Sequence, residues 1–184
     1  MTNLTRRNLL AAGTALPLAG LAAGTARAEA PMMGASFATH RRFMIGDFEV
    51  TTILGGTTPR ENPQGIFGMN VSEEEFANVS RENFLETDAS QFFFTPTLVN
   101  TGSEVILFDT GLNAAATVGA LEGAGYSADQ VDVVVLTHMH GDHIGGLMNE
   151  GAPTFVNARY VAGQVEYDHW AQTGNEGFEA NVRP

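Results

Sequence analysis

The sequence predicts an α/β domain with a mixed sheet, on three observations. Strand-like and helix-like segments alternate along the chain, which is typical of α/β folds. An almost uninterrupted apolar run over 131–136 suits a strand covered on both faces. The 184 residues suffice for one domain with a real core, and are too few for two of comfortable size.

The first 28 residues are interpreted as an export signal. Arg6 and Arg7 precede a weakly apolar run, which ends in the small-x-small cleavage site Ala26-Arg27-Ala28. The run is short for a membrane span and contains Pro17 and several glycines, so no stable membrane anchor is expected after cleavage. The paired arginines favour twin-arginine export, and we predict a periplasmic or secreted bacterial protein with its domain over 29–184.

The first part of that domain is predicted to contain a strand pair, a loop and a helix. Alternating apolar residues over 43–54 indicate two strands around a turn at Gly46. Residues 55–70 are rich in Gly, Pro, Thr and Asn, which predicts a long surface loop with a functional or mobile character. Ser72 then starts a helix that ends near residue 83.

The second part alternates strands and helices. Patterning predicts, in order, strands at 91–100 and 104–108, a helix at 113–125, strands at 131–136, 154–156 and 159–161, and a helix at 163–171. The aromatic run at residues 92–94 is assigned to the core of its strand.

Charge and composition narrow the function classes. The formal net charge is −12 and the chain has no lysine, which excludes a basic nucleic-acid footprint. The chain has no cysteine, so it has no disulfides and any metal must be held by nitrogen and oxygen ligands.

The decisive motif follows the apolar strand directly, and places His138, His140, Asp142 and His143 in the spacing H-x-H-x-D-H. Imidazole and carboxylate are common metal ligands, and the first two histidines can converge on one ion. The Asp142-His143 pair can then turn toward a second ion. A tight loop permitted by Gly141 would carry these side chains at the carboxyl end of a strand, where α/β sites lie. The alternative is a surface loop with no ligand role.

These residues resemble a known family. The segment 137–146 is similar to the signature of the metallo-β-lactamase superfamily, and Phe108-Asp109-Thr110-Gly111 resembles its upstream strand-end motif. The leader and the stretch 167–170 resemble the branch of methyl parathion hydrolase and the quorum-quenching lactonases. The resemblance implies an αββα sandwich built from two similar halves, of which this chain supplies the first. We therefore expect a fragment of a chain about twice as long, with a large exposed apolar surface.

The resemblance also implies the ligand sets. His138 and His140 would bind the first metal, and Asp142 and His143 the second. A third histidine, a bridging aspartate and a further histidine are expected downstream of the motif. His169 follows the motif, but the family has no ligand at its position.

The implied function is metal-dependent hydrolysis of small esters such as lactones or organophosphates. Two ions, by default Zn2+, with Mn, Fe or Co as alternatives, would hold a bridging hydroxide. Asp142 is the candidate catalytic residue, since it could also relay a proton, and Asp109 would orient the ligand loop by hydrogen bonding. Trp170 and Phe178 match aromatic positions of the leaving-group pocket, although core packing is the favoured interpretation for both.

Two alternatives stay open: an iron-dependent redox member of the same superfamily, and an inactive fragment with a partial metal site. No serine has a His/Asp partner in a nucleophile-like setting, which disfavours a serine hydrolase. The expected partner is a small-molecule substrate, with no nucleic acid, and a homodimer is one option for assembly.

Overall fold

The computed structural model describes residues 31–184, so the predicted signal peptide at 1–28 lies outside the described residues. Residues 37–184 form one compact unit, whereas residues 31–36 belong to a separate unit and carry neither helix nor strand. No helix in the described part of the chain has the length and apolar character needed to cross a membrane. The elements are β1 (His40–Ile45), β2 (Phe48–Ile53), β3 (Gly56–Glu61), α2 (Gln64–Phe67), α3 (Glu73–Glu82), β4 (Ala89–Phe94), β5 (Thr97–Asn100), β6 (Val105–Phe108), α4 (Ala114–Gly123), η1 (Ala128–Gln130), β7 (Val133–Leu136), α5 (Gly141–Ile144), β8 (Met148–Asn149), β9 (Ala152–Pro153), β10 (Arg159–Ala162), α6 (Gln164–Trp170) and α7 (Glu176–Asn181).

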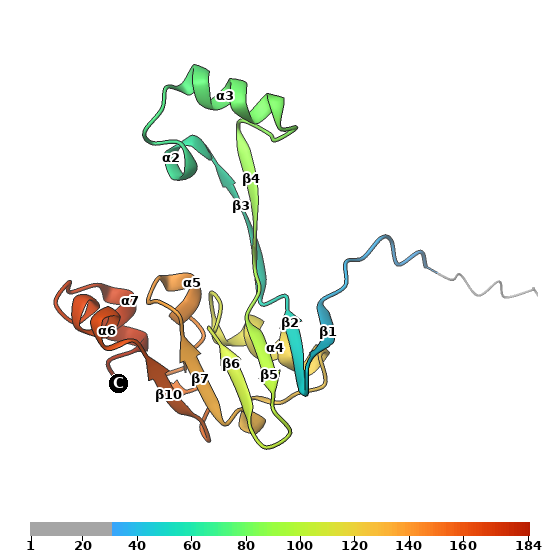
Figure 1. Cartoon of the computed structure of the whole chain (residues 1–184), viewed down its shortest axis with the longest axis vertical. Coiled ribbons are helices and arrows are strands. Elements are labelled where there is room, and N and C mark those ends of the chain that lie inside the picture. The colour runs from blue at the N-terminus through green and yellow to red at the C-terminus, as the bar shows by residue number, and fades with distance from the viewer. Residues whose placement is uncertain (1–30) are drawn as a thin grey trace, which may run out of the picture. The chain divides into compact units, whose positions relative to one another are not determined.

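Six strands form one mixed sheet in the order β1-β2-β5-β6-β7-β10 (Figure 1). The neighbours from β1 to β6 are antiparallel, and β6, β7 and β10 are parallel to one another. The predicted hairpin is confirmed, because Ile45 pairs with Phe48 across a turn in which Gly46 has a φ of 58°. This left-handed backbone conformation favours glycine. The predicted α/β class with a mixed sheet is likewise confirmed.

Helix α4 covers one face of this sheet and forms the core with it. Leu98, Leu107 and Val134 share one register row across three strands, and each is fully buried in the core that includes Leu121 of α4. The helix begins where the sequence predicts it, since the side chain of Asn113 accepts a hydrogen bond from the first turn. A continuous apolar layer therefore supports the strands that lead to the metal-like motif.

The opposite face of the sheet is less protected. Its central row contains Val99 and Ile106, which are half-buried. Toward the β1 edge, Ile45 and Phe48 keep 59% and 50% of their surface exposed. This face therefore exposes apolar side chains toward the β1 edge.

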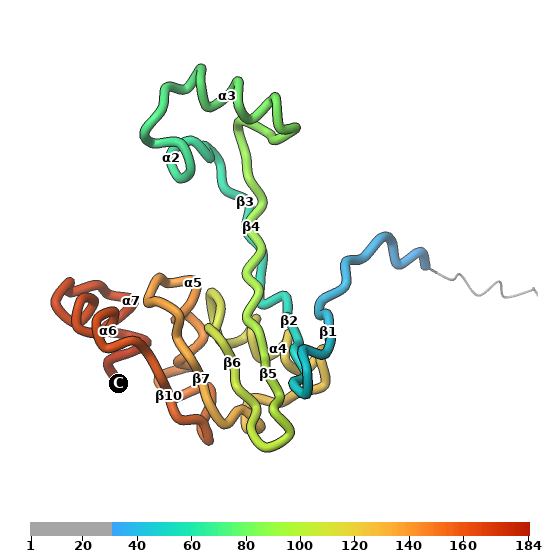
Figure 2. Tube along the Cα trace, viewed as in Figure 1, coloured from blue at the N-terminus to red at the C-terminus, as the bar shows by residue number. Residues whose placement is uncertain are grey.

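Residues 55–70 are not the surface loop that the sequence predicts. Residues 56–61 form β3, which pairs antiparallel with β4, and α2 follows (Figure 2). We call β3, α2, α3 and β4 the arm. The partner strand lies beyond α3 in the sequence, so local composition gave no sign of the pairing.

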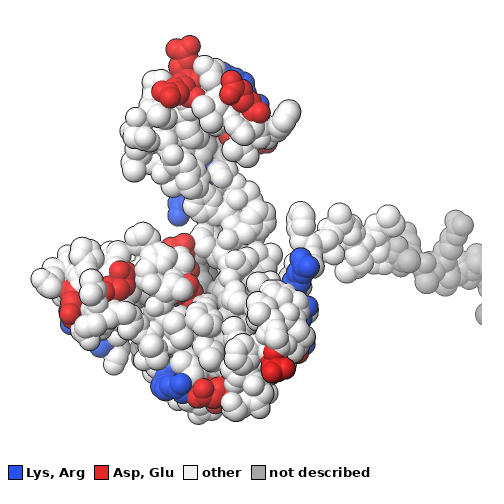
Figure 3. Space-filling model, viewed as in Figure 1, with Lys and Arg blue, Asp and Glu red and all other residues white. Residues whose placement is uncertain are grey.

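The predicted helix start is confirmed, with Oγ of Ser72 accepting from the amide of Glu75 at 3.2 Å. Acidic side chains gather at the α3 end of the arm (Figure 3).

The single strand predicted over 91–100 is also wrong, because the chain forms two strands in two different sheets. The break falls at Thr95-Pro96, where proline has no amide hydrogen to donate to a strand neighbour. The carbonyl of Pro96 instead accepts a hydrogen bond from Ile53 at 3.0 Å. This break lets β4 leave the sheet and carry the arm.

The last part of the chain follows the prediction in two of three elements. Strand β10 and helix α6 lie where they are expected. Residues 154–156 do not form a strand; Phe155 is fully buried in the core, and a small β8–β9 hairpin precedes it. Helix α7 was not predicted, and its Phe178 also enters the core.

Candidate metal centre

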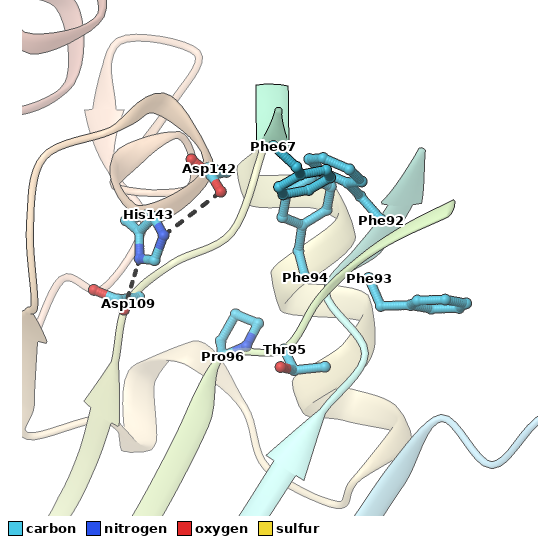
Figure 4. Close-up of a pocket in the computed structure, with 9 residues that line it drawn as sticks. All are labelled: Phe67, Phe92, Phe93, Phe94, Thr95, Pro96, Asp109, Asp142 and His143. Atoms are coloured by element: carbon cyan, nitrogen blue, oxygen red, sulfur yellow. Dashed lines mark hydrogen bonds and ion pairs between the residues drawn. The ribbon is translucent and has the colours of Figure 1, made fainter. Parts of the chain in front are cut away.

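Two neighbouring parallel strands deliver the candidate ligands. Asp109 follows the last residue of β6, and Thr137 follows the last residue of β7. Because β6 and β7 run parallel, both segments emerge at the same edge of the sheet. Asp109, Asp142 and His143 face one another at this edge (Figure 4).

His138 and His140 form the first candidate pair. Nε2 of His138 lies 3.2 Å from Nδ1 of His140, and the ring centroids are 4.7 Å apart. Two nitrogen ligands held about 2.0–2.1 Å from one tetrahedral zinc ion stand about 3.3–3.4 Å apart. The separation of these two nitrogens therefore fits a pair of ligands on one ion.

Asp142 and His143 form the second candidate pair. Oδ2 of Asp142 lies 3.5 Å from Nε2 of His143, close to the spacing of an oxygen and a nitrogen ligand on one ion. The rings of His138 and His143 are 3.8 Å apart, so the two pairs are adjacent. All four side chains thus lie together, although their roles as ligands remain a prediction.

Neither pair is a complete metal site by itself. Within residues 31–184, no group of three or more His, Asp and Glu side chains is arranged to hold one ion. A tetrahedral zinc site takes three or four protein ligands. Each pair by itself therefore supplies fewer ligands than a tetrahedral zinc site takes.

Asp109 holds the start of the ligand segment. Its Oδ1 accepts from the amide of Thr137, and its Oδ2 accepts from the Thr137 hydroxyl, each at 2.8 Å. Oδ2 also lies 2.8 Å from Nδ1 of His143. A hydrogen bond from Nδ1–H to this carboxylate leaves Nε2 of His143 free to bind metal, and fixes the ring orientation.

The motif lies only partly on the loop that the sequence predicts, because Asp142 and His143 belong to a short helix. His140 is the N-cap residue of the short helix α5, which contains Asp142 and His143. Gly141 begins this helix with ordinary φ, and an added Cβ there would meet no atom within 4 Å. A tight loop therefore does not explain this glycine.

The close approach of backbone occurs instead at Gly145 and Gly146. A Cβ at Gly146 would lie 2.1 Å from the carbonyl oxygen of Thr110, and one at Gly145 would lie 2.2 Å from that of Leu112. The Thr110 hydroxyl donates to the His143 carbonyl at 2.9 Å and accepts from the amide of Gly146 at 3.2 Å. The two glycines thus let the Asp109 turn pack directly on the ligand helix.

An aromatic cavity of about 300 Å3 opens beside the second pair (Figure 4). Asp109, Asp142 and His143 line one side of it. The other side is lined by Phe67 of α2 together with residues 92–96. A polar metal-like cluster and an apolar wall therefore face the same space.

The assignment of residues 92–94 to the core is wrong. Phe93 keeps 56% of its surface exposed, and Phe92 and Phe94 are half-buried. The ring of Phe92 lies 5.6 Å from that of Phe67 and 6.3 Å from that of Phe94. Sequence reasoning missed these pocket residues because their strand leaves the main sheet for the arm, which the aromatic run alone did not signal.

Glu166 is a further residue that the sequence did not single out. Its Oε1 accepts from the amide of Met139 at 2.9 Å and from the indole Nε1–H of Trp170 at 2.7 Å. The amide of Met139, more than any other group, lowers the pKa of the Glu166 carboxyl, and nearby His138 adds to this. No sequence pattern links position 166 to the motif, since the contact depends on how α6 packs.

The remaining aromatic candidates occupy different positions. The ring of Trp170 lies 5.6 Å from that of His140. Phe178 is fully buried, with its ring 5.5 Å from that of Tyr167. Neither Trp170 nor Phe178 is among the residues that line the aromatic cavity in the described part of the chain. Their role in a substrate pocket stays a prediction. His169 is exposed on α6.

Comparison with known proteins agrees with this geometry. The sequence model of the metallo-beta-lactamase superfamily matches residues 95–177, which include the Asp109 turn and all four candidate ligands. The chain is 39% identical over 59 residues to an anti-Pycsar protein Apyc1 from Paenibacillus sp. (strain J14). That match covers 32% of this chain and 23% of the relative.

Two similar solved structures extend the comparison over more of the fold. AidC, described as a dizinc quorum-quenching lactonase in complex with a product, superposes with a TM-score of 0.68 at 25% identity, covering 73% of this chain and 48% of AidC. The hydrolase AbOPH of the beta lactamase superfamily has a TM-score of 0.67 at 24% identity, covering 76% of this chain and 50% of AbOPH.

Residues 95–177 thus match the model of the metallo-beta-lactamase superfamily, and the fold is similar to that of AidC. Its structural neighbours include hydrolases of the superfamily and quorum-quenching lactonases. The matches span about half of the length of AidC and AbOPH.

Proposed function

We propose that this chain contributes the ligands of its H-x-H-x-D-H motif to a metal-dependent hydrolase of small esters, such as lactones or organophosphates. The site would take two divalent ions, with zinc the first choice. The proposal is supported by the hydrolases among the structural neighbours and by the geometry of the two candidate ligand pairs.

The single observation that carries the proposal is the spacing within these pairs. The two ring nitrogens of His138 and His140 stand 3.2 Å apart, and the Asp142 and His143 donor atoms 3.5 Å apart. Both values suit two ligands on one tetrahedral ion. The donors are imidazole nitrogen and carboxylate oxygen, which suit zinc, manganese, iron and cobalt.

Bound divalent metal would supply Lewis-acid activation of water and of the attacked carbonyl or phosphoryl oxygen. The chain's own residues then have distinct tasks. Asp109 holds His143 in the orientation that leaves Nε2 free. The Asp142 carboxylate lines the cavity, so it can accept the proton that the attacking water gives up and pass it to the departing alkoxide.

The aromatic wall favours substrates with an apolar or aromatic group. Phe67, Phe92 and Phe94 face the carboxylates across the cavity, so an apolar substituent can pack on the rings while the ester lies near Asp142 (Figure 4). These rings also exclude water from one side of the site. An acyl chain or an aryl leaving group fits this description.

The experiment is a hydrolysis assay of the purified chain loaded with zinc, on an acyl lactone and on an aryl phosphotriester. We expect zinc-dependent turnover of at least one substrate, and Asp142→Asn should lower it by at least about 100-fold. Asp168→Asn on exposed α6 is the matched control and should leave turnover unchanged. Protein that neither binds zinc nor hydrolyses either substrate would count against the proposal.

The same preparation separates the alternatives. Stoichiometric iron with oxygen consumption and no hydrolysis would replace the hydrolase with a redox member of the superfamily. Zinc that binds without turnover would identify a chain that holds a partial site and lacks activity by itself.

A further inference from the structure

Glu166 lies directly behind the turn that joins the first two candidate ligands. It belongs to α6, whereas His138 and His140 follow β7, so the contact is made only in the folded chain. The residue between the two histidines is Met139, whose side chain is 1% exposed. The Met139 side chain thus anchors the turn in the core, and its amide points toward α6.

One carboxylate oxygen of Glu166 holds two groups at this turn. Oε1 accepts the backbone amide of Met139 at 2.9 Å and the indole Nε1–H of Trp170 at 2.7 Å. The Trp170 ring meets the ring of His140 edge-on, with 5.6 Å between centroids and 87° between planes. Glu166 therefore connects the backbone of the turn to the side chain that packs on its second histidine.

The geometry of the first ligand pair depends on this turn. Nε2 of His138 and Nδ1 of His140 are 3.2 Å apart, and the peptide unit that carries the Met139 amide lies between them. If that peptide unit rotates, the two rings move relative to each other. Charge-assisted hydrogen bonds to a carboxylate are stronger than neutral ones, and so resist such rotation.

We propose that Glu166 is a positioning residue that holds the His138-Met139-His140 turn in the conformation needed to bind the first metal ion. This inference rests on the proposed metal-dependent function. It also gives Trp170 a task other than lining a substrate pocket: its indole donates to Glu166, and its ring supports His140.

The test measures two properties of the full chain: zinc affinity and hydrogen exchange of the Met139 amide without metal. Glu166→Ala removes both acceptor contacts, and we expect zinc affinity to fall by about 10–100-fold. The Met139 amide should exchange faster in the same variant. Glu166→Gln keeps a carbonyl oxygen that can accept, so it should retain more affinity and more protection than Glu166→Ala.

Two further variants separate positioning from a general loss of structure. Asp168→Ala removes an exposed carboxylate from the same helix, and should change neither property. Trp170→Phe removes the indole donor but keeps an aromatic ring, and should give a smaller loss of affinity than Glu166→Ala. If Glu166→Ala does not fold, the zinc affinity and Met139 exchange of Glu166→Gln and Trp170→Phe are compared with those of Asp168→Ala. Values equal to those of Asp168→Ala in both variants would then contradict the positioning role.

Wild-type zinc affinity and unchanged Met139 exchange in Glu166→Ala would overturn the proposal. A wild-type chain that binds no zinc would instead refute the proposed metal centre. In that case, hydrogen exchange of the Met139 amide alone would decide whether Glu166 stabilises the turn.

Discussion

Replacing Gly146 by alanine should damage both stability and the candidate metal centre. The added Cβ would lie 2.1 Å from the Thr110 carbonyl oxygen and 3.1 Å from the Thr110 carbonyl carbon. Nonbonded heavy atoms prefer a separation of about 3.5 Å, so the overlap exceeds 1 Å by this measure. The obstructing atoms are backbone, so relief requires the Asp109–Thr110 turn to move away from α5.

The magnitude follows from two contributions. Overpacking of a tight contact costs about 1–3 kcal/mol. Moving the turn also weakens the Thr110 hydroxyl bonds to His143 and Gly146, at about 1 kcal/mol each. The sum is about 3–5 kcal/mol, which at about 2–4 °C per kcal/mol lowers Tm by roughly 10 °C.

Thermal and urea unfolding of the purified chain provide the assay. The matched control is Gly141→Ala at the start of α5, where an added Cβ meets nothing within 4 Å. Alanine favours helices over glycine, so the control should be neutral or stabilised by up to about 1 kcal/mol. If Gly146→Ala has the same Tm as the wild type, the close backbone contact does not constrain this turn, and the reasoning is refuted.

Three further predictions concern the site, pH and export. Asp109→Asn should lower zinc affinity by about 10–100-fold, because the orientation of His143 loses its charged acceptor; unchanged affinity in a zinc titration would contradict this. The lowered pKa of Glu166 makes the folded state more stable above the carboxyl's ordinary range, and this stabilisation is lost as pH falls through the folded value. Urea unfolding across this range should show a weaker pH dependence for Glu166→Gln than for the wild type. Replacing Arg6 and Arg7 together by Lys should reduce export in cell fractionation, whereas efficient export of that variant would argue against a twin-arginine signal.

Local sequence patterns correctly predicted the elements that are determined by interactions between residues close in the sequence. The glycine turn at Gly46, the Ser72 cap and the apolar run of β7 each act within a few residues, and each of these elements is present. The metal-like motif also lies at the end of the expected strand. Composition identified the Gly- and Pro-rich segment after β2 as irregular, but its pairing with β4 depends on residues beyond α3.

The features that sequence reasoning missed depend on tertiary packing. In the sequence, Phe92 and Phe94 have the pattern of core residues. The strand break at Pro96 places them in the arm, where they face the candidate ligands. Glu166 is one of many carboxylates in an acidic chain. Only the packing of α6 behind the turn shows that it accepts the Met139 amide.

Zinc titration of the chain and its single ligand variants tests the central claim most directly. If the motif holds metal as two pairs, the wild-type chain binds zinc, and His138→Ala and His140→Ala lose the same binding event. Asp142→Ala and His143→Ala should each lose a second zinc-binding event, distinct from the first. Zinc affinity that is unchanged in all four variants would contradict the assignment of these residues as ligands.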